Sequence, residues 1–211
     1  MSDPVTIVTF DWVPDMPRGF VRDLRVRWLL EEIGRPYTVE TVPLRGKVAD
    51  HFRQQPFGQV PFVRVGGLTL FESGAILLHL AKGTPLLPEG DAGAQTLQWV
   101  IAALNSVEPW VTNWMIARLF RNDPVLIEAA MPTMTLRLTQ LQDVLADREW
   151  LVPQGFTVAD LLMADVLRIP DRDDQLAPYP GLAAYKARAL ARPAFAKAYA
   201  DQMAHWQKAG P

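Results

Sequence analysis

The chain has 211 residues, of which 49% are hydrophobic and 21% are charged. This composition is typical of a globular protein with one large domain or two small ones. With 21 basic and 23 acidic residues, the net charge is −2, so neither nucleic acid nor an anionic membrane is expected as a partner. Cysteine is absent and the three histidines are scattered, which excludes disulfides and predicts no metal site.

The sequence shows no membrane span and no secretory signal. The longest apolar runs fall far short of the ~20 residues that a spanning helix needs. Residues 1–4 carry no basic region ahead of an apolar core, so we expect a cytoplasmic protein. Serine occurs only at Ser2, Ser73 and Ser106. Because none lies in a nucleophile elbow, a hydrolase triad is not expected.

Strand and helix signals alternate in the first third of the chain. The expected elements are strands over 5–10, 37–42, 60–65 and 68–71, and helices over 18–33, 47–54 and 72–81. Gly34 ends the first helix, and Gly66 with Gly67 supplies the positive φ that a two-residue hairpin turn demands. The order β-α-β-α-β-β-α predicts a mixed four-stranded sheet whose first two strands are parallel.

Beyond a linker over 84–91, which is rich in proline and glycine, the pattern is helical. Pro109 is expected to kink the first long helix of this part. Thr157 and Asp160 form a capping box ahead of an apolar helix. Two helices, over 180–191 and 193–206, close the chain. We therefore predict an α/β domain over 1–83 and an all-helical domain over 92–211.

Four local motifs occur in a known order. They are Gln55-Pro56-Phe57-Gly58-Gln59-Val60-Pro61, Phe71-Glu72-Ser73, Arg25-Val26-Arg27-Trp28-Leu29-Leu30-Glu31-Glu32, and the pair Thr157 and Asp160. Together with the domain order they resemble the cytosolic glutathione transferases, of the bacterial type. The resemblance covers the whole chain. It implies a thioredoxin-like first domain, an all-α second domain and glutathione as co-substrate.

The resemblance also implies where glutathione binds. Glu72 and Ser73 would hold the γ-glutamyl end, because a helix N-terminus with a hydroxyl favours a carboxylate. Val60 would present its backbone to the cysteinyl unit ahead of Pro61, with a cis bond between the two. Gln59 and Lys47 match positions that hold the glycyl carboxylate. For Lys47 a solvated lysine is an equal alternative, and for Ser73 the alternative is a plain helix cap.

The chain departs from the family at the catalytic position. Residues 11–21 contain no Tyr, Ser, Thr or Cys, and the position of the usual serine falls at or near Phe20. We expect backbone N–H groups at Phe20 and the start of the first helix to contact the thiol, close to Trp12. Arg18 is the candidate charged helper. The alternative for Arg18, Arg22, Arg25 and Arg27 is a solvated or ion-paired helix face.

The electrophile pocket is expected to include Trp12, Trp110, Trp114 and Met115, with core packing as the alternative for these aromatics. The favoured reaction is attack of glutathione thiolate on a hydrophobic electrophile in a homodimer. The main alternative is a non-catalytic glutathione- or hydrophobe-binding protein of the same fold. A disulfide reductase is disfavoured because the chain lacks cysteine. An isomerase that uses glutathione as a cofactor is a further alternative, although the Ser-Ser-Cys cluster of the family's isomerase class is absent.

Overall fold

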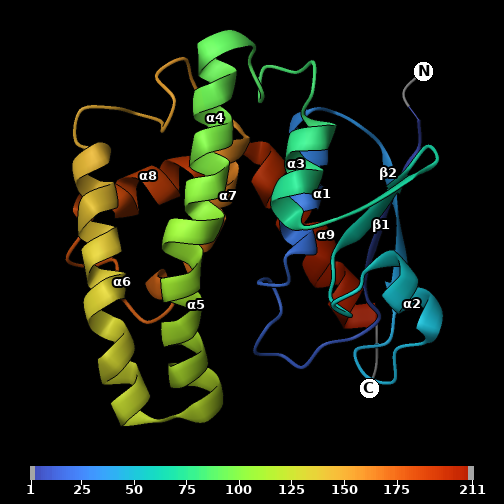
Figure 1. Ribbon diagram of the computed structural model, residues 1–211, viewed down its shortest axis with the longest axis horizontal. Coiled ribbons are helices and arrows are strands. Elements are labelled where there is room, and N and C mark those ends of the chain that lie inside the picture. Colours follow the sequence, from blue (N-terminus) through green and yellow to red (C-terminus); the bar gives the residue numbers. More distant parts are fainter. Residues whose placement is uncertain (1–2, 209–211) are drawn as a thin grey trace. The chain divides into compact units, whose positions relative to one another are not determined.

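The computed structural model describes residues 3–208, which form two compact units. The first unit contains the chain up to Lys82 together with the segment from Arg192 onward, and the second spans Gly83–Ala191. All four strands within the described residues lie in the first unit (Figure 1). The expected division assigned 92–211 to one helical domain. The contacts instead group the last helix with the α/β unit.

The first unit has the predicted β-α-β-α-β-β-α order. Its elements are β1 (Val5–Phe10), α1 (Asp23–Glu32), β2 (Tyr37–Val42), α2 (Ala49–Gln54), β3 (Phe62–Val65), β4 (Leu68–Phe71), α3 (Ser73–Leu80) and α9 (Pro193–Lys208). The strands lie in the order β2-β1-β3-β4. Strands β1 and β2 are parallel, and the other two pairings are antiparallel. The predicted thioredoxin-like sheet is confirmed.

Strand register brings several predicted site segments to one edge of this sheet. Phe62, the first residue of β3, lies opposite Phe71, the last residue of β4, and opposite Val8 near the end of β1. Because the pairings are antiparallel, the residues just beyond these pairs meet at the same edge. Pro61 and Glu72 are therefore neighbours there, and the segment that follows β1 starts beside them.

Helix α1 begins later than the sequence predicts. It starts at Asp23 rather than at residue 18, and residues 15–20 form turns, with Phe20 N–H donating to Pro17 O across 2.9 Å. Gly19 has φ +79°, and a Cβ built there would lie 2.8 Å from the ring of Tyr199 on α9. The left-handed glycine and the ring packed against it are incompatible with a helix through this position.

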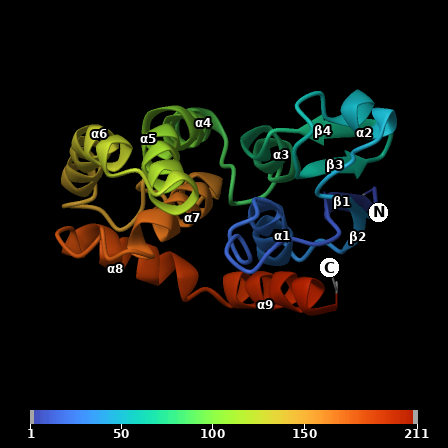
Figure 2. The ribbon, with the colours of Figure 1, turned by 90° about the horizontal axis from the view of Figure 1, so that it is seen from below.

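Helix α9 packs along α1, as Figure 2 shows. Arg192 forms two hydrogen bonds of 2.7 Å with Glu32. Phe195 contacts Trp28 edge-on, with ring centroids 4.8 Å apart. Since α1 is covered on this side as well as by the sheet and α3, it is buried continuously from Asp23 to Leu30. The alternative of a solvated or ion-paired face is therefore wrong as to solvation for Arg25 and Arg27, which are both buried, while Arg27 does form an ion pair with Asp23.

The second unit is helical throughout its regular elements. These are α4 (Gly90–Ala102), a π-helical turn (Ala103–Val107), α5 (Glu108–Met115), a second π-helical turn (Ile116–Arg121), α6 (Pro124–Val144), α7 (Val158–Asp171) and α8 (Pro180–Leu190). The distortion expected near Pro109 is present, because α4 ends in a π-helical turn just before Pro109 enters α5. The capping box of Thr157 and Asp160 is confirmed at the start of α7.

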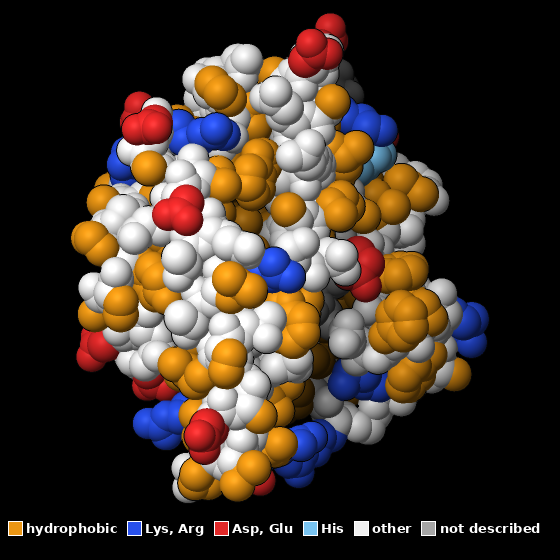
Figure 3. Space-filling view, turned by 60° about the vertical axis from the view of Figure 1, so that its left-hand side comes forward, with side chains coloured by type: hydrophobic (Ala, Val, Ile, Leu, Met, Phe, Trp, Pro, Cys, Tyr) orange, Lys and Arg blue, Asp and Glu red, His pale blue; other side chains and the backbone are white. Residues whose placement is uncertain are grey.

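Hydrophobic side chains are scattered over the surface shown in Figure 3, between polar groups and separate charges of both signs. Large exposed ones in the second unit include Ile101, Phe120 and Val125, of which Val125 is 74% exposed.

Among residues 3–208, no helix combines the length and apolar character needed to cross a bilayer.

Candidate functional site

Ser73 is the first residue of α3 and is only 6% exposed. The preceding residue, Glu72, adopts φ 66°, a region that residues other than glycine seldom occupy. The first turn of α3 carries no acidic side chain. The N-terminal amides and the helix dipole favour an anion at this corner, and the one acidic side chain next to the turn is that of the exposed N-cap residue Glu72.

Arg25 is a member of this site that the sequence reasoning missed. Its guanidinium, 1% exposed, donates from Nη1 to the Ser73 hydroxyl oxygen across 3.1 Å. Since arginine can only donate, Ser73 accepts this bond and keeps its own proton for another acceptor. Only long-range packing against α3 reveals this role, because the local pattern places Arg25 among several arginines of one helix.

The Val60-Pro61 peptide bond is cis, as the resemblance implied. The loop ahead of it is held from inside by two further residues. Gln55, 2% exposed, accepts hydrogen bonds from the N–H groups of Phe57 (2.7 Å) and Gln59 (3.2 Å). His51 donates from Nε2 to Gln59 O at 3.1 Å. These hydrogen bonds fix the backbone that leads to Val60. Burial of the imidazole lowers the pKa of His51.

The two candidates for the glycyl carboxylate, Lys47 and Gln59, lie before and after α2 in the sequence. Lys47 precedes α2, where its ammonium donates to Leu44 O at 2.7 Å and lies 5.0 Å from the centroid of the Phe10 ring. Phe10 ends β1 at the edge that carries Pro61. Gln59 is exposed. Both side chains therefore remain candidates for a carboxylate.

The segment expected to activate the thiol is largely occupied by its own contacts. Arg18 pairs with Asp15 at 2.8 Å and donates from Nε to Val13 O at 3.2 Å. The Phe20 N–H is used within a turn, and Trp12, half-buried, donates its backbone N–H to the Asp11 carboxylate at 2.7 Å. The helix start near Arg18–Val21 that was expected to lie beside the thiol is absent, because α1 begins at Asp23.

Two polar groups near this segment were not singled out from the sequence. Thr9, at the end of β1, is fully buried, and its hydroxyl has no hydrogen-bond partner among residues 3–208. Asp23 places a buried carboxylate in the first turn of α1, where Arg27 neutralises it through a 2.7 Å ion pair. The start of α1 therefore already holds an anion of its own.

The aromatic residues proposed for the electrophile pocket differ in exposure. Trp114 is 3% exposed and belongs to the packed interior of the helical unit. Trp110 and Met115 are half-buried on the same helix, α5, and Trp12 is half-buried in the first unit. Trp114 thus follows the core-packing alternative, while the other three keep surface for a ligand. Within residues 3–208, no three side chains of His, Asp or Glu gather closely enough to hold a metal ion.

Comparison with known proteins agrees with the fold and these motifs. The glutathione S-transferase N-terminal domain model matches residues 17–82, and the C-terminal domain model matches residues 111–193. Glutathione S-transferase 3 of Zea mays is 29% identical over 195 residues, covering 84% of this chain and 88% of that protein. Glutathione S-transferase GstA of Escherichia coli O157:H7 is 30% identical over 153 residues, covering 66% and 73%.

The fold similarity extends over almost the whole chain. The crystal structure of the glutathione transferase URE2P6 from Phanerochaete chrysosporium, in complex with oxidized glutathione, matches with a TM-score of 0.83 at 21% identity. The match covers 96% of this chain and 98% of that one. With both family models matched and the relatives covered over most of their length, the chain belongs to the glutathione S-transferase family.

Proposed function

We propose that this protein is a glutathione transferase that conjugates the glutathione thiolate to a hydrophobic electrophile. The observation that carries the proposal is the meeting of the cis Val60-Pro61 peptide and the Glu72-Ser73 turn at one sheet edge, set by the register of β3 and β4. The first offers backbone groups to the cysteinyl unit, and the second offers donors to the γ-glutamyl carboxylate. Lys47 and Gln59 would hold the glycyl carboxylate.

The electrophile would bind against half-buried hydrophobic side chains. Trp110 and Met115 on α5 are the candidates in the helical unit, and Trp12 is a separate candidate in the first unit. Hydrophobic side chains of this kind select a ligand by shape and by the apolar area that it buries. Most of the rate would come from deprotonation of the thiol and from proximity. The thiol titrates at about 8.5 when unperturbed, so the enzyme must lower this pKa.

A second candidate is a glutathione-binding protein without turnover. The occupied 11–22 segment favours it, because this segment lacks a hydroxyl or thiol side chain and Arg18 and the Phe20 N–H already have partners within the protein. In this alternative the site that includes Ser73 and Val60 keeps its role, and the thiol remains protonated at neutral pH.

A homodimer and a cytoplasmic location belong to the same proposal. Phe57, 68% exposed, and Phe52, 48% exposed, give the first unit a large unshielded apolar surface. Leu97 and Ile101 on α4 do the same for the helical unit. Such surfaces are typical of protein interfaces, and a twofold pairing of the small domain with the partner's helical domain would cover both.

One experiment separates the two candidate functions. Calorimetric titration with reduced glutathione measures binding, and a conjugation assay with a generic aromatic electrophile measures turnover. Saturable binding with turnover is the result expected for the transferase. Binding without turnover identifies the binding protein, and failure to bind glutathione contradicts both.

A further inference from the structure

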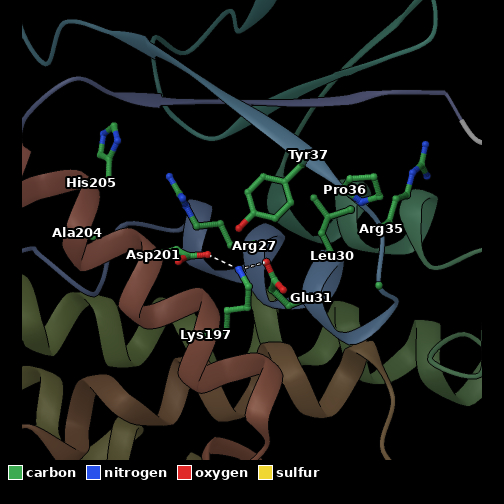
Figure 4. A pocket seen from close by; sticks show the side chains of 11 residues that line it. Arg27, Leu30, Glu31, Arg35, Pro36, Tyr37, Lys197, Asp201, Ala204 and His205 are labelled. Carbon is green, nitrogen blue, oxygen red and sulfur yellow. Dashed lines mark hydrogen bonds and ion pairs between the residues drawn. The ribbon is translucent and has the colours of Figure 1, made fainter.

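A pocket within the first unit shares no lining residue with the candidate glutathione site at Ser73 and Val60, although its lining residue His205 donates from Nε2 to Phe10 O at 2.9 Å. It is a groove of about 620 Å³ bordered by α1, the turn into β2 and α9 (Figure 4). Leu30, Pro36 and Ala204 give it apolar walls. Most of the remaining lining residues are polar or charged. The groove therefore offers apolar surface to the hydrocarbon part of a ligand and polar groups to its charged part.

Arg27 is the most unusual member of this lining. Its side chain is only 4% exposed, and the one hydrogen bond that the described residues give it runs from Nε to Asp23. Nη2 is buried and has no hydrogen-bond partner among residues 3–208. Figure 4 shows the guanidinium extending past the hydroxyl end of Tyr37. A buried guanidinium nitrogen without an acceptor, such as Nη2 of Arg27, gains more from an added anion than a solvated one does.

The acidic residues of the groove are already committed to another cation. Lys197 donates to Glu31 at 2.9 Å and to Asp201 at 2.6 Å, the two contacts drawn as dashed lines in Figure 4. Both carboxylates raise the pKa of Lys197, which therefore stays charged. Because Glu31 and Asp201 both accept hydrogen bonds from Lys197, neither carboxylate is the acceptor that Nη2 of Arg27 lacks.

Two further donors face the same groove. Burial raises the pKa of the Tyr37 phenol. The negative charges of Glu31 and Asp201 also raise this pKa, whereas the positive charges of Arg27 and Lys197 lower it. The hydroxyl thus stays protonated at neutral pH and can donate. Arg35, at the opposite end from His205 in Figure 4, donates from Nη2 to Asp3 O at 2.7 Å, while its Nε has no partner within residues 3–208.

We propose that this groove binds a small organic carboxylate, with its anionic group on Arg27 and the Tyr37 hydroxyl and its apolar body against the exposed side chains of Pro36 and Ala204. An aromatic carboxylate fits this division of polar and apolar lining. The site is independent of the glutathione site proposed above, since no lining residue of the groove belongs to that site.

The proposal is tested by NMR titration of the full ¹⁵N-labelled chain with benzoate, and with benzamide as the uncharged control of the same shape. The expected result is saturable benzoate binding with a Kd on the order of 1 mM, shifts centred on Gly34, Tyr37 and Ala204, and no matching response to benzamide. Saturating glutathione should leave these shifts unchanged. Shifts that centre on Ser73 and Val60 and disappear with glutathione would overturn the proposal, as would equal binding of benzamide.

Two variants and one control define the contacts. Tyr37→Phe should weaken benzoate binding several-fold, because it removes one donor and preserves the ring. Arg27→Lys keeps the positive charge beside Asp23 but loses the second donor arm, and should weaken binding about tenfold. Arg53→Gln alters an exposed arginine of α2 outside the groove and should bind as the unchanged protein does. Unchanged binding by both Tyr37→Phe and Arg27→Lys would contradict the site.

Discussion

The Arg25 guanidinium lies 3.1 Å from the Ser73 hydroxyl oxygen, although 48 positions separate the two residues in the sequence. Both side chains are buried, and the bond joins α1 to the first turn of α3. It supplies the hydroxyl oxygen with a donor and leaves the hydroxyl proton for a ligand. We therefore expect the N-terminal turn of α3 to bind an anion through the oriented serine hydroxyl and the backbone amides of that turn.

Replacing this serine gives the most direct test of the glutathione site. Ser73→Ala should weaken glutathione affinity by about 1.5–3 kcal/mol, the range for a hydrogen bond to a charged group. Calorimetric titration measures the loss, and thermal unfolding serves as control, since a lost cap costs only ~1 kcal/mol. Wild-type affinity in a folded Ser73→Ala protein would remove Ser73 from the site.

Arg25 should act on the ligand through Ser73. Arg25→Met removes the donor that orients the hydroxyl, so glutathione affinity should fall about 3–10-fold, less than for Ser73→Ala. The two losses should not add in the double variant, because they report on one arrangement. Arg22→Met, at an exposed position of the same segment, is the matched control. Additive losses would show that Arg25 and Ser73 act separately.

The ion pair of Arg18 with Asp15 sets the expectation for thiol activation. With Arg18 held by Asp15, Arg18→Ala should slow conjugation only several-fold, whereas a key transition-state donor would cost about 10²–10³-fold. Asp15→Asn should release Arg18 and lower the thiol pKa in the complex, followed by the ultraviolet absorbance of the thiolate. A thiol pKa equal to that of free glutathione in every variant would favour the binding protein.

His51 predicts a pH dependence of the loop that holds Val60. Burial lowers its pKa in the folded protein below the unfolded value of about 6.5. As pH falls, His51 is therefore protonated in the unfolded chain at a higher pH than in the folded protein. The contribution of neutral His51 to folding stability is complete above about pH 6.5 and is lost as pH falls through the lower folded pKa. Urea unfolding at pH 7.5 and 5.5 should show this loss. His51→Gln should diminish the difference, and an unchanged difference would exclude His51 as its source.

Asp160 predicts a stability loss larger than that of an ordinary cap. Its fully buried carboxylate accepts hydrogen bonds from Leu151 N (2.8 Å), the Thr157 N–H (2.9 Å) and hydroxyl (3.0 Å), and the Tyr185 hydroxyl (2.9 Å). Asp160→Ala should cost roughly 3–5 kcal/mol, because several buried donors lose their acceptor. Tyr185→Phe, which removes one of these bonds, should cost about 1 kcal/mol. Equal losses in urea unfolding would contradict this ranking.

Sequence signals that involve only neighbouring residues were sufficient to predict many of the turns, caps and strands of this protein. Gly66 and Gly67 between two short apolar runs predicted the β3–β4 hairpin, and the spacing of Thr157 and Asp160 predicted the α7 cap. The motif from Gln55 to Pro61 and the Glu72-Ser73 pair located the candidate glutathione site. Turns, caps and strands of this kind are determined by backbone preferences and by hydrogen bonds over a few residues, which a sequence displays directly.

Packing between distant segments decided the rest. Helix α1 starts at Asp23 because Gly19 adopts a left-handed backbone against Tyr199, 180 positions later. Arg25 contacts Ser73 because α3 lies beside α1, and Arg27 is buried under α9. The final helix belongs with the first unit for the same reason. An arginine on a helix carries no local mark of burial, because its exposure depends on which distant element covers that face.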